Sequence, residues 1–219
     1  MNTKKTFLFG ACLFAAAALS AGSAKAAFIA GIDMDYPASG GVYYTEPGFA
    51  SVPTAGQDYN VTTNGITFDL NGTCKGMANR YRNQPAFPLE TDFAQWWSSG
   101  GTAELECTFS GLEAEKEYTV TFWTYNMGAG QTTHDFYEGE VAVENLLGTF
   151  TTSGNQNDPD NWVPSVDWDL TSDANGMIVV NLRGGERITV DGIAIAPEPA
   201  TMGLLALGGL AALRRRRRA

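Results

Sequence analysis

Residues 102–109 read TAELECTF, and this stretch decides the fold. Its apolar and polar side chains alternate strictly. The apolar members are Ala103, Leu105, Cys107 and Phe109, and the polar members between them are Glu104, Glu106 and Thr108. Because successive side chains of a strand point to opposite faces, this period of two predicts a strand with one buried face and one face in water.

Similar stretches follow along the chain, and clusters of Gly, Asn, Asp and Ser separate them. They are GITFDL (65–70), YTVTFWTYN (118–126), EGEVAVEN (138–145), LLGTFTT (146–152), SVDWDL (165–170), MIVVNL (177–182) and RITVDGIAI (187–195). No stretch shows a helical period, and the connection 71–101 is too long for a hairpin. Short strands with frequent turns predict an all-β fold, an antiparallel β-sandwich of the jelly-roll kind.

The N-terminus predicts a secretory signal peptide over residues 1–26, with a helical apolar segment. Lys4 and Lys5 precede an apolar run from Thr6 to Leu19, and Ala24 and Ala26 form an A-x-A cleavage site. The apolar run is shorter than the ~20 residues that a permanent span needs. We therefore expect cleavage before Ala27 and an exported protein.

Residues 27–196 are long enough for one domain with a sizeable core. Its 6 basic and 23 acidic side chains leave a formal charge of −17, more acidic than the −10 of the whole chain. Coulomb repulsion by such a surface disfavours nucleic acid and anionic lipid as partners.

Two cysteines remain after the signal peptide, Cys74 and Cys107. Cys74 continues the parity of Ile66, Phe68 and Leu70, so both thiols are expected to reach the core face. In an oxidising compartment such a pair tends to form a disulfide, and we predict one between them. The alternative is two buried thiols.

The C-terminus combines three features in order. Pro197 and Pro199 surround Glu198 and keep this segment extended, because proline cannot donate to a ladder. The apolar run Thr201–Leu213 follows, a short transmembrane helix of about 20 Å against a hydrocarbon core of about 30 Å. Five arginines then resist translocation: Arg214, Arg215, Arg216, Arg217 and Arg218. Together they predict a temporary membrane-inserted intermediate with its extended part exposed to a processing enzyme.

This tail, residues 197–219, resembles the PEP-CTERM sorting signal of exopolysaccharide-producing Gram-negative bacteria. The resemblance covers the motif Pro197-Glu198-Pro199, the apolar helix and the arginine cluster. It implies recognition by exosortase, a membrane-embedded protease, and removal of the helix and basic tail. The implied destination is the cell surface or extracellular matrix.

A second and looser resemblance covers the domain. It rests on RYRN (80–83), on Asp92-Phe93, on FSGLEAEKEYTVTFWTYN (109–126) and on a terminal VDGIAI strand. The domain is similar to the β-sandwich modules found upstream of such tags, which supports the fold and assigns no activity.

The residues give no catalytic set, and we predict that the protein is not an enzyme. His134 is the only histidine, and we expect it in an exposed loop. No nucleophile elbow of the G-x-S-x-G type occurs. A pair of carboxylates for glycoside hydrolysis is the least favoured alternative, because spacing along the sequence does not show which two would face each other.

Calcium is the one cofactor that the sequence suggests. The loop NQNDPDNW (155–162) gathers hard oxygen donors at Asn155, Asn157, Asp158 and Asp160, without the glycine and glutamate of an EF-hand. The alternative is a solvated turn. Asp33 with Asp35, and Asp167 with Asp169, are further pairs that are either ligands or wet-face residues.

A glycan site is the other candidate. Arg80 and Arg82 share a face if their segment is extended, and guanidinium groups pair with the carboxylates of acidic sugars. The alternative is an internal ion pair, for example with Asp92. Trp96 and Trp97 are adjacent, so one ring is expected to point outward, where it can stack on a sugar. Trp162 is a further candidate, whereas Trp123 and Trp168 are expected in the core.

Together these features predict an exported surface or matrix protein with a non-catalytic β-sandwich that contacts exopolysaccharide. The main alternative is a purely structural surface protein without a specific ligand.

Overall fold

The computed structural model describes residues 28–35, 45, 47–52, 58–72, 76–81, 92–98, 100–124, 132–151 and 165–198. They all belong to one compact unit, Phe28–Glu198. The predicted signal helix and the predicted C-terminal membrane helix lie outside the described residues.

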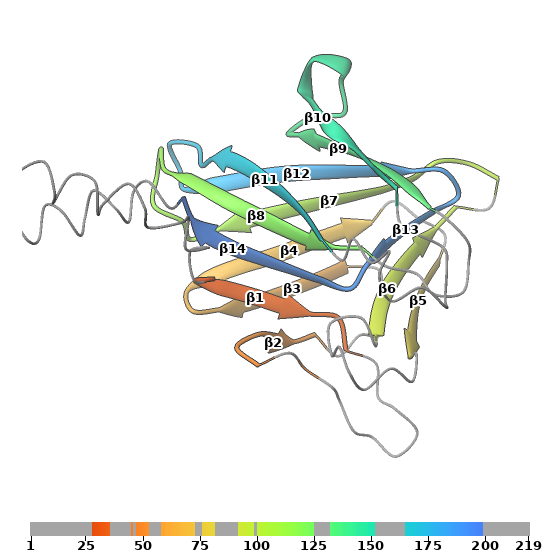
Figure 1. Ribbon diagram of the computed structural model, residues 1–219, viewed down its shortest axis with the longest axis horizontal. Coiled ribbons are helices and arrows are strands. Elements are labelled where there is room, and N and C mark those ends of the chain that lie inside the picture. The colour runs from red at the N-terminus through yellow and green to blue at the C-terminus, as the bar shows by residue number, and fades with distance from the viewer. Residues whose placement is uncertain are drawn as a thin grey trace, which may run out of the picture. The chain divides into compact units, whose positions relative to one another are not determined.

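The unit is built from three sheets (Figure 1). The first sheet has the order β11 (Ser165–Thr171), β8 (Glu117–Trp123), β14 (Gly192–Pro197), β1 (Ala30–Asp33) and β2 (Ala50–Ser51). The second has the order β10 (Leu146–Thr151), β9 (Thr133–Glu138), β12 (Met177–Gly184), β7 (Ala103–Ser110), β4 (Ile66–Gly72) and β3 (Asp58–Thr63). The third is short, with the order β13 (Arg187–Val190), β6 (Asp92–Trp97) and β5 (Gly76–Tyr81). A 3₁₀ turn, η1 (Val143–Asn145), joins β9 to β10.

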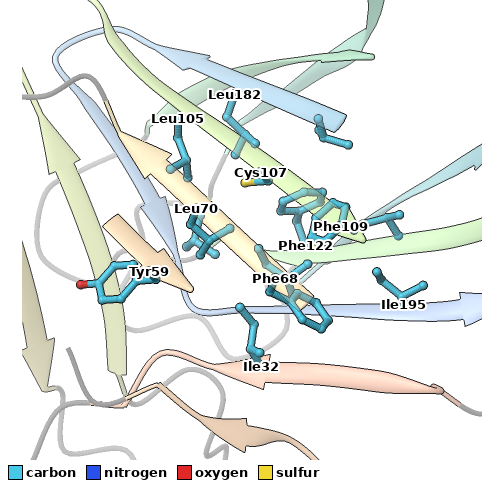
Figure 2. Packing of buried hydrophobic residues seen from close by; sticks show 14 of the residues in the cluster. Ile32, Tyr59, Phe68, Leu70, Leu105, Cys107, Phe109, Phe122, Leu182 and Ile195 are labelled. Atoms are coloured by element: carbon cyan, nitrogen blue, oxygen red, sulfur yellow. The ribbon is translucent and has the colours of Figure 1, made fainter. Parts of the chain in front are cut away.

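Strand β7, which contains the stretch that opened the sequence analysis, lies between β4 and β12. All four of its apolar side chains are fully buried, as the alternation predicts. The register sets Cys107 opposite Leu70 on one side and Val180 on the other. Apolar residues of β4 and β12 likewise lie opposite Phe109 on its two sides, so rows of apolar residues cross the sheet at Cys107 and Phe109 (Figure 2).

Aromatic rings fill the space between the first and second sheets. Phe122 of β8 contacts Phe109 of β7 at 6.3 Å between ring centroids and Phe136 of β9 at 5.3 Å. Phe136 in turn contacts Trp168 of β11 at 5.5 Å. Since these rings come alternately from the first and second sheets, the core is the interior of a sandwich, and the predicted all-β sandwich is confirmed.

The predicted strand over 187–195 is two strands, because the chain turns a corner at Asp191. Strand β13 pairs with β6 in the third sheet, whereas β14 pairs with β8 and β1 in the first. The backbone of Asp191 makes hydrogen bonds on both sides. Its N–H donates to the Trp123 carbonyl at 2.8 Å, and its carbonyl accepts from the Met34 N–H at 2.9 Å.

Two further expectations are corrected by the strand bounds. The stretch 138–145 was expected to be a strand, but only Glu138 is in one; turn residues and η1 follow, and Val143 is 88% exposed. The stretch 71–101 was expected to be one long connection, but it contains β5 and β6. In 138–145, no neighbouring strand among the described residues buries Val141 and Val143. In 71–101, β13 pairs with β6 and so completes a strand ladder there.

The turn before β12 shows why glycine is required there. Gly176 has a φ of +72°, and a Cβ on it would lie 2.1 Å from the Leu112 carbonyl oxygen. Asp173 closes the same turn, since its Oδ1 accepts from the N–H groups of Asn175 and Met177, each at 2.8 Å. The hydrogen bond from Met177 is the main reason that the pKa of Asp173 is lowered.

Candidate functional site

Three aromatic side chains form a cluster on the outer face of the first sheet, here called the aromatic cluster. Its members are Phe28, Phe49 and Trp123, and all three pairs of rings meet edge to face. The centroid distances are 5.9 Å for Phe28–Phe49, 5.7 Å for Phe28–Trp123 and 5.6 Å for Phe49–Trp123. Phe28 is 40% exposed, and the other two rings are half-buried.

Gly31 of β1 lies beneath the cluster. A Cβ on Gly31 would lie 2.8 Å from ring carbons of Phe49, so the ring lies directly on the backbone of β1. Gly31 alternates with Ala30 and Ile32, which are in the core, and Trp123 follows the buried Phe122. The cluster therefore lies outside the core, on the face that the sandwich turns away from the second sheet.

A row of threonine–aspartate pairs continues the same face. Thr121 Oγ1 donates to Asp167 Oδ1 at 2.7 Å, and Thr119 Oγ1 donates to Asp169 Oδ1 at 2.7 Å. The register of β8 with β11 sets each threonine directly opposite its aspartate. Thr121 lies two residues before Trp123, so hydrogen-bonding groups and aromatic rings share one surface.

Sequence reasoning missed this cluster, because it expected Trp123 in the core. The signal was present in the parity of β8, because Tyr118, Val120 and Phe122 are buried in the core and Trp123 has the opposite parity. Phe28 and Phe49 gave no periodic signal, because neither lies in a strand.

The predicted tryptophan pair is divided between two environments. Trp96 is fully buried in the core, contrary to its inclusion in an exposed glycan site. Trp97 is half-buried and lies opposite Arg187. Alternation along β6 is the physical reason, because Trp96 lies opposite the fully buried Ile188 on the core face and Trp97 points to the other face.

The structure does not place the two predicted glycan-binding arginines, Arg80 and Arg82, in a described site. Arg80 lies in β5 opposite Phe93, and Arg82 lies outside the described residues. Their role as glycan ligands stays a prediction.

The predicted calcium ligands Asn155, Asn157, Asp158 and Asp160 also lie outside the described residues. Within the part of the chain that the structure describes, no group of three His, Cys, Asp or Glu side chains is arranged to hold a metal ion.

The two other acidic pairs, Asp33 with Asp35 and Asp167 with Asp169, differ in burial. Asp33 and Asp35 are fully buried, so they are not wet-face residues, and Thr45 Oγ1 donates to Asp35 Oδ2 at 2.6 Å. Asp167 and Asp169 are exposed, and each accepts the threonine hydrogen bond described above.

Cys107 is a free and fully buried thiol, which differs from the disulfide expected with Cys74. Its neighbours across the sheet are the apolar Leu70 and Val180. Burial raises the pKa of the thiol well above its usual range, so the thiol stays protonated. Cys74 lies outside the described residues.

His134 is fully buried in β9, whereas an exposed loop position was expected. Neither ring nitrogen has a hydrogen-bond partner among the described residues. Desolvation lowers the pKa of His134 to about 4, against a smaller opposing effect of Asp135. The imidazole is therefore neutral in the folded protein at neutral pH.

Folding stability is expected to fall as the pH decreases from about 6.5 towards 4. The unfolded chain binds a proton at His134 near pH 6.5, the folded chain only near pH 4, so acid favours unfolding. The loss is on the order of 2–3 kcal/mol and is measured by urea unfolding at a series of pH values. His134→Leu should reduce this slope, and an unchanged slope in that variant would show that another group is responsible.

The end of β14 carries the start of the predicted sorting motif. Pro197 is the last residue of β14 and lies opposite Tyr118, and the Glu198 N–H donates to the Glu117 carbonyl at 3.2 Å. Pro199 and the arginines of the predicted stop-transfer cluster lie outside the described residues. No helix within the described part of the chain has the length and hydropathy needed to cross a bilayer.

Comparison with known proteins identifies the C-terminus. Residues 196–218 match the PEP-CTERM protein-sorting motif. No curated protein matches the chain.

Solved structures of carbohydrate-binding modules are distantly similar to the sandwich. TmCBM61, solved in complex with β-1,4-galactotriose, is 15% identical with a TM-score of 0.36, over 60% of this chain and 88% of that one. A family 35 module from Paenibacillus barcinonensis is 16% identical with a TM-score of 0.34, over 65% and 100%. The K1 cleaved adhesin domain of Lys-gingipain from Porphyromonas gingivalis W83 is 12% identical with a TM-score of 0.35, over 59% and 90%.

The described residues define the fold as an all-β sandwich. The chain also carries a C-terminal PEP-CTERM sorting motif, as the resemblance noted in its sequence predicts. This motif implies processing by exosortase, export and sorting to the cell surface.

Proposed function

We propose that this protein is a non-catalytic, glycan-contacting protein of the cell surface or extracellular matrix. In this proposal residues 1–26 are removed as a signal peptide, 27–196 form the sandwich, and 197–219 direct export and are trimmed. The observation that carries the glycan proposal is the aromatic cluster, because its partly exposed rings share a face with the exposed carboxylates of Asp167 and Asp169.

This combination suits sugars physically. The apolar face of a pyranose ring packs on an aromatic side chain, and its hydroxyl groups exchange hydrogen bonds with neighbouring polar groups. Asp167 and Asp169 place negative charge on this face. We therefore expect neutral glycans to bind in preference to acidic ones, since a carboxylated sugar would be repelled.

Loss of the aromatic cluster is expected to weaken binding to exopolysaccharide from the producing strain by about tenfold, because central aromatic residues dominate interface energetics. The variants are Phe28→Ala and Trp123→Ala, in exported protein isolated from its host and assayed by co-sedimentation. Val143→Ala is the matched control, because Val143 is 88% exposed in η1, outside the first sheet.

Two results of this experiment would favour other functions. If the wild type does not sediment with any glycan, with or without added calcium, the structural alternative replaces the glycan proposal. If binding is intact in both cluster variants, the glycan site lies elsewhere, and Trp97 with Arg80 and Arg82 is the next set to change.

The finer architecture is also part of this proposal. The orders β1-β14-β8-β11 and β7-β12-β9-β10, with the chain passing repeatedly between the two sheets, support a jelly-roll assignment. Calcium bound by Asn155, Asn157, Asp158 and Asp160 stays a further part of this proposal.

A further inference from the structure

The first half of the sorting motif is part of the folded sandwich. Strand β14 continues through Ala196 opposite Thr119 and Pro197 opposite Tyr118. One residue later the Glu198 N–H donates to the Glu117 carbonyl. No linker separates the domain from the motif, because the ladder of β14 on β8 continues into it.

The Glu198 side chain is influenced by Glu117 at the start of β8. The pKa of Glu198 is raised, first by hydrogen bonding to the Glu117 carboxyl and then by the charges of Glu117 and Asp169. Asp169 belongs to β11, the neighbour of β8 on its other side. Two carboxyl groups share such a bond only while one holds a proton, and they repel each other when both are ionised.

Hydrogen bonds from side chains hold the start of β8 in place. The Tyr118 hydroxyl accepts from the Glu113 N–H at 3.0 Å. Ser172 Oγ donates to the Glu113 carbonyl at 2.6 Å and accepts from the Lys116 N–H at 3.1 Å. Because this end of β8 is fixed, releasing the motif requires β14 to move and not β8.

A protease that binds an extended peptide uses the same backbone groups that a neighbouring strand uses. While Pro197 and Glu198 lie on β8, the Glu198 N–H donates to the Glu117 carbonyl. A protease can then bind only the backbone groups on the opposite edge of the motif. Binding to β8 and binding to a processing enzyme therefore compete for one backbone segment.

We propose that the start of β8, Glu117 and Tyr118, is a docking site for the protein's own sorting motif, and that release from it limits how fast the motif reaches its processing enzyme. Glu117 is a positioning residue here, since it acts on Glu198 and not on the reacting atoms. This inference rests on the proposed processing by exosortase.

Glu117→Gln is the sharpest test of this docking site. Glutamine can donate to the Glu198 carboxylate without a shared proton and removes the repulsion, so it should hold the motif more firmly at neutral pH. In the full-length chain in its host, we expect tail removal to slow roughly two- to fivefold in a pulse-chase experiment. Exchange of the Glu198 amide hydrogen should slow in parallel in the purified unprocessed chain. Glu113→Gln changes the same charge at an exposed position nearby and should behave as the wild type.

A second variant tests the docking site without changing Glu117. A four-residue Gly-Ser spacer between Ala196 and Pro197 lengthens the chain before the motif, and we expect faster removal of the tail by roughly fivefold. Unchanged rates in both the glutamine and the spacer variants would overturn the docking site. A different result would be a wild-type protein that keeps its tail while its Glu198 amide is protected from exchange. That result would overturn processing by exosortase but would still support docking of the motif on β8.

Discussion

Replacing Trp96 with alanine is expected to lower the free energy of unfolding by about 3–5 kcal/mol, the cost of removing a large buried aromatic side chain. Trp96 is fully buried, and its ring meets Tyr59 of β3 edge to face with 6.0 Å between centroids. A Cβ on Gly72 of β4 would lie 2.2 Å from Trp96 Cδ1, so the indole also lies against the backbone of the second sheet. The ring therefore joins the third sheet to the sandwich.

Urea unfolding of the exported protein measures this loss. Trp97→Ala is the matched control, because Trp97 is the next residue in β6 but only half-buried, and it should cost less than half as much. If the two variants were equally destabilised, the division of the tryptophan pair between core and surface would be wrong.

Replacing Glu198 with alanine is expected to leave the tail uncut in nearly all exported molecules. The reason is that Glu198 is the charged residue of the matched sorting motif. Mass spectrometry of the exported protein measures the outcome directly, since an uncut chain keeps Arg214–Arg218. Glu106→Gln in β7 is a control with the same loss of charge at an exposed site of the second sheet.

This variant also separates recognition of the motif from its docking on β8. Alanine at 198 keeps the backbone N–H that donates to the Glu117 carbonyl and removes a charge that repels Glu117, so an effect on docking alone would slow trimming without abolishing it. Loss of recognition by exosortase stops it instead. Normal or faster trimming of Glu198→Ala would refute the assignment of exosortase as the processing enzyme.

Much of the sandwich was predictable because its signal is local. The alternation in 65–70 and 102–109 predicted the buried faces of β4 and β7 correctly. The same rule applied to THDFYE (133–138) would have found β9, because His134 and Phe136 alternate with Thr133 and Asp135. The polarity of histidine led to the wrong expectation of an exposed loop.

The candidate site was much less predictable. The aromatic cluster brings Phe28 and Phe49, which lie outside strands, onto Trp123 of β8. No pattern within any one of these segments indicates the others. The burial of Asp33 and Asp35 was also missed, since their parity is opposite to that of the core residues Ile32 and Met34.

The sequence by itself determined the class of fold, the core faces of the main strands and the sorting signal, because strand periodicity and a C-terminal signal are properties of contiguous residues. Only the tertiary structure decided which outer face carries aromatic rings and that Pro197 and Glu198 lie on β8. These depend on pairing between segments far apart in the chain, and pairing is set by the packing of the whole sandwich and not by any segment alone.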